Sequence, residues 1–257
     1  MKFLTSAFKA LINAYRPIRK INIIYEIAHL LIWIYSRVVL RMNVYKHSKL
    51  HKGAKIFAAN HPSFTDPFLL HLHEKMNVLV TSEAFGNGLT NKLLHKVGEI
   101  PVAPGGDSLE QAIKCLKAGH SIGIFPEGVI SPHEGGMARA RSGAARLALS
   151  TGVSIVPVGI HINRKLLKPV KFRLNGQCLS SYIYLRGAYS VTVGEPMYFS
   201  GDPEDRVLVN KVTKIIAERI KDLAYESELR MVNRVSPLQT IFQTIKRAFS
   251  FRLIGMV

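Results

Sequence analysis

Short continuous apolar runs alternate with helix-like apolar stripes through the middle of this chain. The continuous runs, which predict buried strands, lie at 54–59, 78–81, 99–102, 121–125 and 154–160. The stripes, which repeat with the spacing of one helix face, predict helices at 68–76, 85–97, 108–118 and 138–150. Strands that alternate with helices favour an α/β fold in which helices pack on a central, largely parallel sheet.

The pattern changes after this alternating region. Residues 170–195 predict added antiparallel strands, and Asp202-Pro203 is a cap-and-start pair for a long closing helix that reaches Ser227. Because no internal repeat or low-complexity linker divides the chain, we expect one layered domain with a segment on either side. The domain, the N-terminal segment and the C-terminal segment are predicted at 46–230, 1–45 and 231–257.

Both flanking segments carry an amphipathic helical pattern. The apolar stripes are Leu4, Phe8, Leu11, Ile12 and Tyr15 at one end, and Leu238, Ile241, Phe242, Ile245 and Phe249 at the other. Lys and Arg flank both stripes, which is typical of helices that lie in a membrane interface. The alternative is two helices that pack on the core with solvated basic faces.

The net charge of +18 is concentrated at these two ends. Residues 1–55 hold eleven Lys and Arg against Glu26 alone, a net charge of +10, and residues 229–257 hold five with no acid. The rest of the chain therefore carries only +3. A nucleic-acid-binding protein more often places its positive charge on the docking face of its core fold. The distribution favours an anionic membrane surface as partner, and no nucleic acid.

Residues 21–40 are strongly apolar but contain Glu26, His29 and Arg37. The longest uncharged part is far shorter than the ~20 apolar residues that a membrane span needs. We expect a helix that dips into one leaflet, or one that packs as a hairpin with residues 3–18. A true span is the alternative.

The cellular compartment follows from the cysteines and the first residues. Cys115 and Cys178 suggest no disulfide framework, which favours a reducing compartment. Residues 1–20 do not resemble a secretory signal, because Lys9 and Arg16 interrupt their apolar residues. We therefore expect a monotopic or peripheral protein on the cytoplasmic face of a membrane.

The segment 60–67, Asn-His-Pro-Ser-Phe-Thr-Asp-Pro, lies between the predicted strand 54–59 and the helix that follows. Pro62 disfavours the helical region for His61, so the histidine lies on a turn, and Asp66 followed by proline predicts an N-cap. On a turn, Asp66 can accept a hydrogen bond from one imidazole nitrogen and leave the other free as a base. The alternative is that Asp66 only caps the helix and His61 is an ordinary polar turn residue.

A second motif, Phe-Pro-Glu-Gly-Val-Ile-Ser at 125–131, begins where the strand predicted at 121–125 ends. Open α/β sheets bind their ligands at the carboxyl ends of strands. An acid beside proline and glycine is also ordinary turn chemistry, so this motif is weak when taken alone.

Together, the two motifs resemble the glycerolipid acyltransferase family, and within it the bacterial 1-acylglycerol-3-phosphate acyltransferases. The resemblance covers roughly residues 50–200 and continues through 98–102, Gly-Glu-Ile-Pro-Val, and 153–158, Val-Ser-Ile-Val-Pro-Val. It implies that His61 removes the proton of the acceptor hydroxyl and that Asp66 orients the ring and supports the imidazolium. Because the acceptor itself attacks, no serine nucleophile is required, although Ser63 beside His61 is an alternative nucleophile.

The resemblance also implies the rest of the site. The residues expected to shape the substrate site are Asn60, Ser63, Phe64, Pro126, Glu127 and Gly128. Glu127 would repel a phosphate as a carboxylate, so we expect it to bond a hydroxyl or an arginine. No metal and no cofactor are expected, and the co-substrate is a thioester of coenzyme A or of acyl carrier protein.

The chain departs from the family pattern at two places. The family usually has an arginine near 103–104, and its third block often reads Thr-Arg where this chain has Val-Ile at 129–130. Both missing groups would help to hold an anionic acceptor. Arg139 and Arg141 lie shortly downstream and are the candidates for binding a phosphate. Their alternative role is a solvated helix face.

The function that the resemblance implies is transfer of a fatty acyl group to 1-acylglycerol 3-phosphate, giving phosphatidic acid in phospholipid biosynthesis. The same chemistry on glycerol 3-phosphate or another lysolipid is an alternative. A catalytically silent lipid-binding protein is the alternative from a different class.

Overall fold

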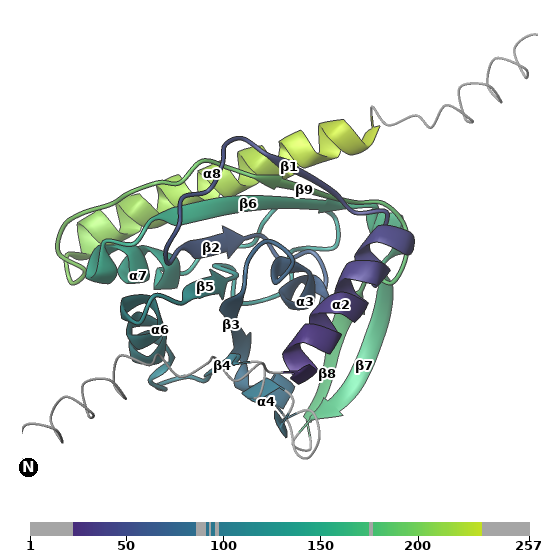
Figure 1. Ribbon diagram of the computed structural model, residues 1–257, viewed down its shortest axis with the longest axis horizontal. Helices are drawn as coiled ribbons and strands as arrows, with labels where there is room; N and C mark the ends of the chain where they lie inside the picture. The colour runs from purple at the N-terminus through teal and green to yellow at the C-terminus, as the bar shows by residue number, and fades with distance from the viewer. Residues whose placement is uncertain (1–22, 86–90, 93, 96–97, 175–176, 233–257) are drawn as a thin grey trace, which may run out of the picture.

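The computed structural model describes residues 23–232, apart from 86–90, 93, 96–97 and 175–176 (Figure 1). Its main sheet has the strand order β1-β9-β6-β2-β5-β3-β4. These strands, in chain order, are β1 (Asn43–Lys46), β2 (Ile56–Ala59), β3 (Met76–Thr81), β4 (Ile100–Val102), β5 (Ser121–Ile124), β6 (Ile155–Ile162) and β9 (Tyr189–Val193). All neighbouring strands are parallel except β6 and β9, so the predicted α/β fold with a largely parallel sheet is confirmed.

Helices cover both faces of this sheet. The helices on one face are α2 (Ile23–Val38) and α3 (Asp66–Leu70), and those on the other are α6 (Ser108–Lys117), α7 (Gly143–Thr151) and α8 (Arg206–Val232) (Figure 1). The central strand β2 has apolar side chains on both faces. Phe57 and Ala59 lie on the face covered by α2 and α3, and Ile56 and Ala58 lie on the face covered by α6, α7 and α8. A strand buried on both faces explains why its sequence is a continuous apolar run.

The long helix α8 packs closely on β6 because Gly159 has no side chain. A Cβ at this position would lie 2.1 Å from the backbone at Leu223 and Ala224. The Ser227 hydroxyl donates to the Gly159 carbonyl oxygen at 2.9 Å, which fixes the helix along this strand. A close helix layer of this kind holds β6, and therefore its neighbour β2, in place.

Three helices begin or end at residues other than those predicted. α3 covers only 66–70, and α7 begins at Gly143 instead of at 138. α8 begins at Arg206 because the Asp205 carboxylate accepts hydrogen bonds from the Val207 and Leu208 N–H groups, so Asp205 caps the helix instead of Asp202. For α8 a polar contact decides the boundary, which an apolar stripe cannot reveal.

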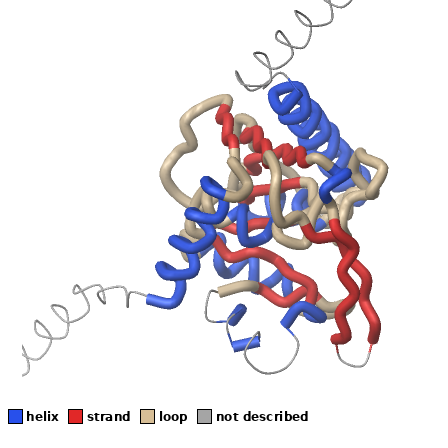
Figure 2. The backbone as a smooth tube through the Cα atoms, turned by 90° about the vertical axis from the view of Figure 1, so that its right-hand side faces the viewer, coloured by secondary structure: helices blue, strands red, loops and turns tan. Residues whose placement is uncertain are grey.

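The antiparallel strands predicted in 170–195 are present. β7 (Lys168–Leu174) and β8 (Gln177–Ile183) form a separate two-stranded sheet that projects from the body of the fold (Figure 2). β9 joins the main sheet, where it also pairs with β1. Strand β1 was not predicted, and it crosses the boundary proposed between residues 45 and 46.

The helix α2 exposes an apolar stripe. Its members, which share one face at helical spacing, are Ile27, Leu30, Leu31, Ile34 and Val38. On the other side, Ile32 and Tyr35 pack against the core. Of the helices within the described ranges, none has the length and apolarity to cross a membrane. The two predicted terminal helices, in 3–18 and 236–257, lie outside the described residues.

Candidate active site

The turn that carries the histidine is anchored to the sheet by Asn60. Its side-chain amide donates to the Ile160 carbonyl oxygen at 2.9 Å, and its amide oxygen accepts from the Ile160 N–H at 2.7 Å. These bonds continue the β2–β6 pairing one residue beyond the strand. Asn60 is 2% exposed, so its contacts position the turn and leave little surface for a substrate.

His61 and Asp66 form the hydrogen-bonded pair that the sequence allows. His61 Nδ1 lies 3.0 Å from Asp66 Oδ2. The same oxygen accepts from the Ser63 N–H at 2.7 Å, and Oδ1 accepts from the Tyr189 hydroxyl at 2.7 Å. Asp66 is fully buried. The N-cap of α3 is Thr65, without a side-chain capping bond, so the expectation that Asp66 caps the helix is wrong.

The position of the imidazole is set by two contacts. An ionised Asp66 can only accept a hydrogen bond, so it selects the neutral tautomer with hydrogen on Nδ1 and leaves the lone pair on Nε2. The ring stacks on Phe125 with centroids 4.2 Å apart, and its side chain is 15% exposed. Such a ring has one nitrogen held and one available as a base.

Ser63 is held in a different way. Its hydroxyl accepts from the Tyr184 N–H at 2.9 Å and lies 3.0 Å from the Thr65 hydroxyl. The residue is fully buried. Ser63 therefore locks the turn onto the chain that follows β8, and its geometry does not match that of a nucleophile activated by His61.

Glu127 joins the two motifs. Its Oε1 accepts from the His61 N–H at 2.9 Å and from the Ser131 hydroxyl at 2.6 Å, and its Oε2 accepts from the Ala138 N–H at 2.6 Å. The bond to a hydroxyl was expected. The two backbone donors were not, and the residue is only 1% exposed. Glu127 thus clamps the loop after β5 onto the histidine turn, and it presents almost no surface to a substrate.

The arginines predicted to hold a phosphate lie on a loop, not on a helix. Helix α7 begins only at Gly143, and the loop before it is held by the Ala138 N–H, which donates to Glu127, and by the Arg141 N–H, which donates to the Pro126 carbonyl oxygen at 2.7 Å. Both Arg139 and Arg141 are exposed. Neither side chain forms a hydrogen bond or ion pair with another residue in the described part of the chain.

Arg141 lies directly over the second motif. Gly128 has a φ of +64°, and a Cβ built there would be 2.9 Å from Arg141 Nε. The absence of a side chain therefore makes room for the guanidinium. Gly128 is exposed, Phe64 is half-buried and Pro126 is buried. Of the residues predicted to bind substrate, Gly128, Phe64, Arg139 and Arg141 are the ones that present surface.

Sequence reasoning missed three residues of this region. Ser131 has a signal, because it closes the second motif, but Tyr189 and Arg164 have none, because distant segments bring them to the site. Arg164 lies in η1 (Arg164–Leu166) and donates to the carbonyl oxygens of Pro132 and Gly136. Burial lowers the pKa of its guanidinium, whereas nearby acids, among them Glu127 and Asp66, oppose that shift.

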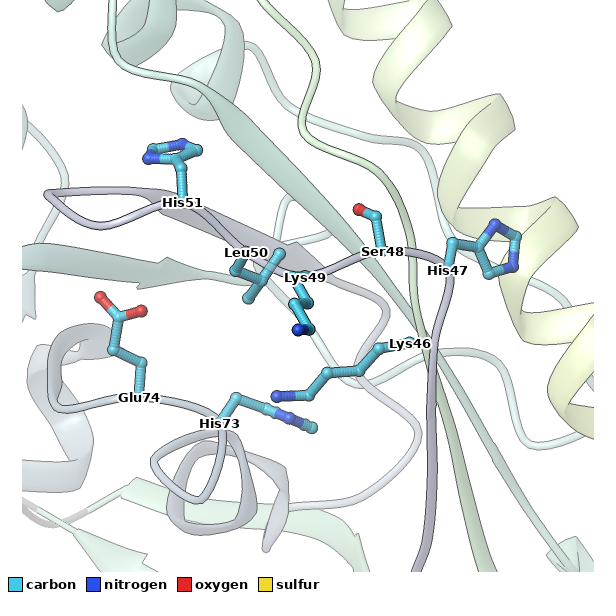
Figure 3. A pocket seen from close by; sticks show the side chains of 8 residues that line it. All are labelled: Lys46, His47, Ser48, Lys49, Leu50, His51, His73 and Glu74. Carbon is cyan, nitrogen blue, oxygen red and sulfur yellow. The ribbon is translucent and has the colours of Figure 1, made fainter.

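A separate hollow, the basic hollow, contains none of these residues. Its lining residues are Lys46, His47, Ser48, Lys49, Leu50, His51, His73 and Glu74 (Figure 3). The Lys46 side chain extends toward His73 (Figure 3). Burial, and then the charge of Lys46, lower the pKa of His73 to about 4. The described residues contain no group of three His, Cys, Asp or Glu side chains suited to a metal.

Comparison with known proteins finds that part of this chain is similar to acyltransferases. Residues 41–161 match the family model described as Acyltransferase. The 1-acyl-sn-glycerol-3-phosphate acyltransferase of Bacillus subtilis (strain 168) is 25% identical over 177 residues, which cover 65% of this chain and 80% of that protein. The protein with the same description from Borreliella burgdorferi is 40% identical over 77 residues, and the chain spans only 29% of its length.

A solved structure has the same fold. The 1-acyl-sn-glycerophosphate (LPA) acyltransferase PlsC from Thermotoga maritima superimposes with a TM-score of 0.55 at 20% identity, covering 84% of this chain and 89% of that chain. At this identity the likeness concerns the fold alone.

The clamp at Glu127 predicts a selective loss of stability. In Glu127→Gln an amide NH₂ replaces one acceptor oxygen and faces an N–H or O–H donor, so we expect the free energy of unfolding to fall by about 2–3 kcal/mol. Urea denaturation measures it. The control is Glu134→Gln, the same change on an exposed residue of the same loop, which should stay within about 0.5 kcal/mol of wild type. Equal stabilities for Glu127→Gln and wild type would contradict the clamp.

Proposed function

We propose that this chain, whose residues 41–161 match the family model described as Acyltransferase, moves a fatty acyl group from a thioester to the free hydroxyl of 1-acylglycerol 3-phosphate. The product is phosphatidic acid. The observation that carries the proposal is the buried Asp66 carboxylate bonded to Nδ1 of a partly exposed His61. A silent lipid-binding protein has no use for a carboxylate buried behind an imidazole in this way, because burying a charge is costly.

The reaction follows from this pair. His61 Nε2 removes the proton of the acceptor hydroxyl as its oxygen attacks the thioester carbonyl carbon. The negative charge of Asp66 stabilises the imidazolium that forms. When the tetrahedral intermediate collapses, the C–S bond breaks, the ester remains, and the imidazolium returns its proton to the thiolate. The step is redox-neutral, and it needs no covalent acyl-enzyme.

No cofactor is proposed for this step, because every proton moves between substrate groups and His61. The co-substrate is a thioester of coenzyme A or acyl carrier protein. Both share the thioester and the thiol leaving group, so the pair acts on them in the same way.

The acceptor phosphate is assigned to the loop that carries Arg139 and Arg141. Arg141 is the stronger candidate because its guanidinium lies over Gly128, next to the residue that clamps the histidine turn. Its planar group can bind phosphate oxygens in pairs. Another lysolipid is the second candidate acceptor, because the absence of arginine at 103–104 and 129–130 favours an acceptor with less negative charge than lysophosphatidate.

The proposed partner surface is the cytoplasmic face of an anionic membrane, because a long-chain acceptor is held in a bilayer. Support comes from the apolar stripe of α2, in which Leu30 is 55% and Leu31 is 61% exposed. Arg37, an exposed residue in the last turn of α2, places positive charge at one end of the stripe. Apolar area together with basic residues is the combination that binds interfacial helices to anionic lipid.

Loss of the base tests the mechanism. Purified His61→Ala should release thiol from acyl-CoA about two to four orders of magnitude more slowly than wild type, the usual effect of losing a general base. Asp66→Asn should also lower the rate, because the neutral amide cannot support an imidazolium. Thermal unfolding shows whether each variant is folded. Wild-type rates from folded His61→Ala would overturn the mechanism.

The assignment of Arg141 is tested with two acceptors. In Arg141→Ala we expect the KM for lysophosphatidate to rise about tenfold or more, while the KM for the thioester stays near wild type. The KM for monoacylglycerol, which has no phosphate, should not rise. Arg139→Ala is the matched control on the same loop and should have the smaller effect. If the KM values for the thioester and for lysophosphatidate changed equally, the assignment of the phosphate to Arg141 would be wrong.

The apolar stripe of α2 is tested with vesicles. The double variant Leu30→Gln, Leu31→Gln should bind vesicles containing phosphatidylglycerol at least about tenfold more weakly, since each buried leucine contributes roughly 1.5–3 kcal/mol. Activity on a short-chain soluble acceptor should be retained. The control is Val207→Gln, on an apolar residue of α8 that is 79% exposed. Unchanged vesicle binding, measured by co-sedimentation, would show that α2 is not the anchor.

A further inference from the structure

The buried carboxylate of Asp66 has a third hydrogen-bond donor that the two motifs do not contain. Its Oδ2 is hydrogen-bonded to His61 Nδ1 and accepts from the Ser63 N–H, whereas its Oδ1 accepts from the Tyr189 hydroxyl at 2.7 Å. Asp66 is fully buried and Tyr189 is 1% exposed, so water has almost no access to this bond. The carboxylate is therefore held from both sides, with one oxygen assigned to the histidine and the other to the tyrosine.

Tyr189 is held firmly enough to position another side chain. It is the first residue of β9, where it pairs with Ile162 of β6, and its N–H donates to the Leu40 carbonyl oxygen at 3.1 Å. Its ring lies in the core that includes Phe57 and Val158. The hydroxyl is thus placed by the main sheet, while Asp66 belongs to a helix of only five residues.

The hydroxyl acts as a permanent donor. Burial, and to a smaller extent the negative charge of Asp66, raise the pKa of Tyr189 well above its ordinary value, so the phenol keeps its proton. A neutral donor on Oδ1 prevents the carboxylate from rotating, and it withdraws negative charge that would otherwise be shared with Oδ2. Both effects act on His61 through Asp66 without any contact between Tyr189 and the reacting atoms.

We propose that Tyr189 is a positioning residue for catalysis. Its hydroxyl holds the Asp66 side chain in the rotamer that faces His61, and it reduces the negative charge on the carboxylate oxygen that is bonded to the imidazole. The proposal rests on the proposed acyl transfer through His61. It adds a third member to the pair, supplied by a strand 123 positions further along the chain.

Removing the Tyr189 hydroxyl has a defined effect on proton binding. Without this donor, more of the carboxylate charge falls on Oδ2, and the His61–Asp66 pair holds its proton more tightly. Since the base must be neutral to act, the acidic limb of the rate profile moves to higher pH. The other titratable or charged groups near the pair are Tyr35, Glu127, Arg164 and Tyr184. Tyr189→Phe changes the charge of none of them.

A matched control is available in the same cluster. Tyr184 is also fully buried, its ring centroid is 6.3 Å from that of Tyr189, and its hydroxyl donates to the Ala188 carbonyl oxygen at 2.9 Å instead of to Asp66. Tyr184→Phe therefore removes one buried neutral hydroxyl from the same part of the core. A loss caused only by weaker packing should appear in both variants.

The test compares the pH dependence of kcat/KM, measured by thiol release, for wild type and both variants. In Tyr189→Phe we expect kcat to fall roughly tenfold, with KM unchanged. The midpoint of the acidic limb should rise by about half a unit to one unit. Tyr184→Phe should leave the midpoint where it is in wild type. The His61 ring signal, identified in NMR spectra by its loss in His61→Ala, should titrate with the same shift.

The outcomes separate this proposal from the proposed function. If wild type releases no thiol with any acceptor, acyl transfer fails, whereas the NMR titration still tests whether Tyr189 controls the pair. If wild type is active and Tyr189→Phe shows the wild-type midpoint in both measurements, Tyr189 is not a positioning residue. An equal shift in Tyr184→Phe would overturn the proposal in the same way, because it would assign the effect to packing.

Discussion

A buried carboxylate must find hydrogen-bond donors for both oxygens, and Glu127 finds them in two separate turns. One oxygen accepts from the His61 N–H after β2 and from Ser131, and the other accepts from the Ala138 N–H. Leaving such a group without donors costs more than the bonds themselves contribute. The two loops therefore have to close on one another. The position of His61 follows from this requirement.

The second buried carboxylate, Asp66, extends the same principle across the sheet. Its three donors come from His61, from the backbone of the turn, and from β9. Strand β9 runs antiparallel to β6, which brings its first residue back to the edge of the sheet where the parallel strand β2 ends. Strand β9 thereby supplies a hydrogen-bond donor to Asp66, the first residue of the five-residue helix α3.

The apolar helix α2 is linked to the histidine turn by hydrogen bonds. Its Tyr35 hydroxyl donates to the Leu185 carbonyl oxygen at 2.7 Å, in the chain between β8 and β9. Tyr184, next to Leu185, holds the Ser63 hydroxyl through its N–H. The exposed apolar stripe of α2 and the turn that bears His61 are therefore separated by two hydrogen-bonded contacts. In the proposed function, this connection links the lipid-binding helix to the histidine.

The sequence by itself determined the layered α/β fold, the placement of both motifs at strand ends, and the possibility of a His61–Asp66 contact. These depend on local periodicity and on turn chemistry, which nearby residues control. The tertiary structure decided that Asp66 faces His61 instead of capping α3, that Glu127 is a clamp, and that Arg141 lies over Gly128. It also brought in Tyr189 and Arg164. Each of these depends on buried polar groups whose partners are distant in sequence, and no local pattern records which distant donor will satisfy a given acceptor.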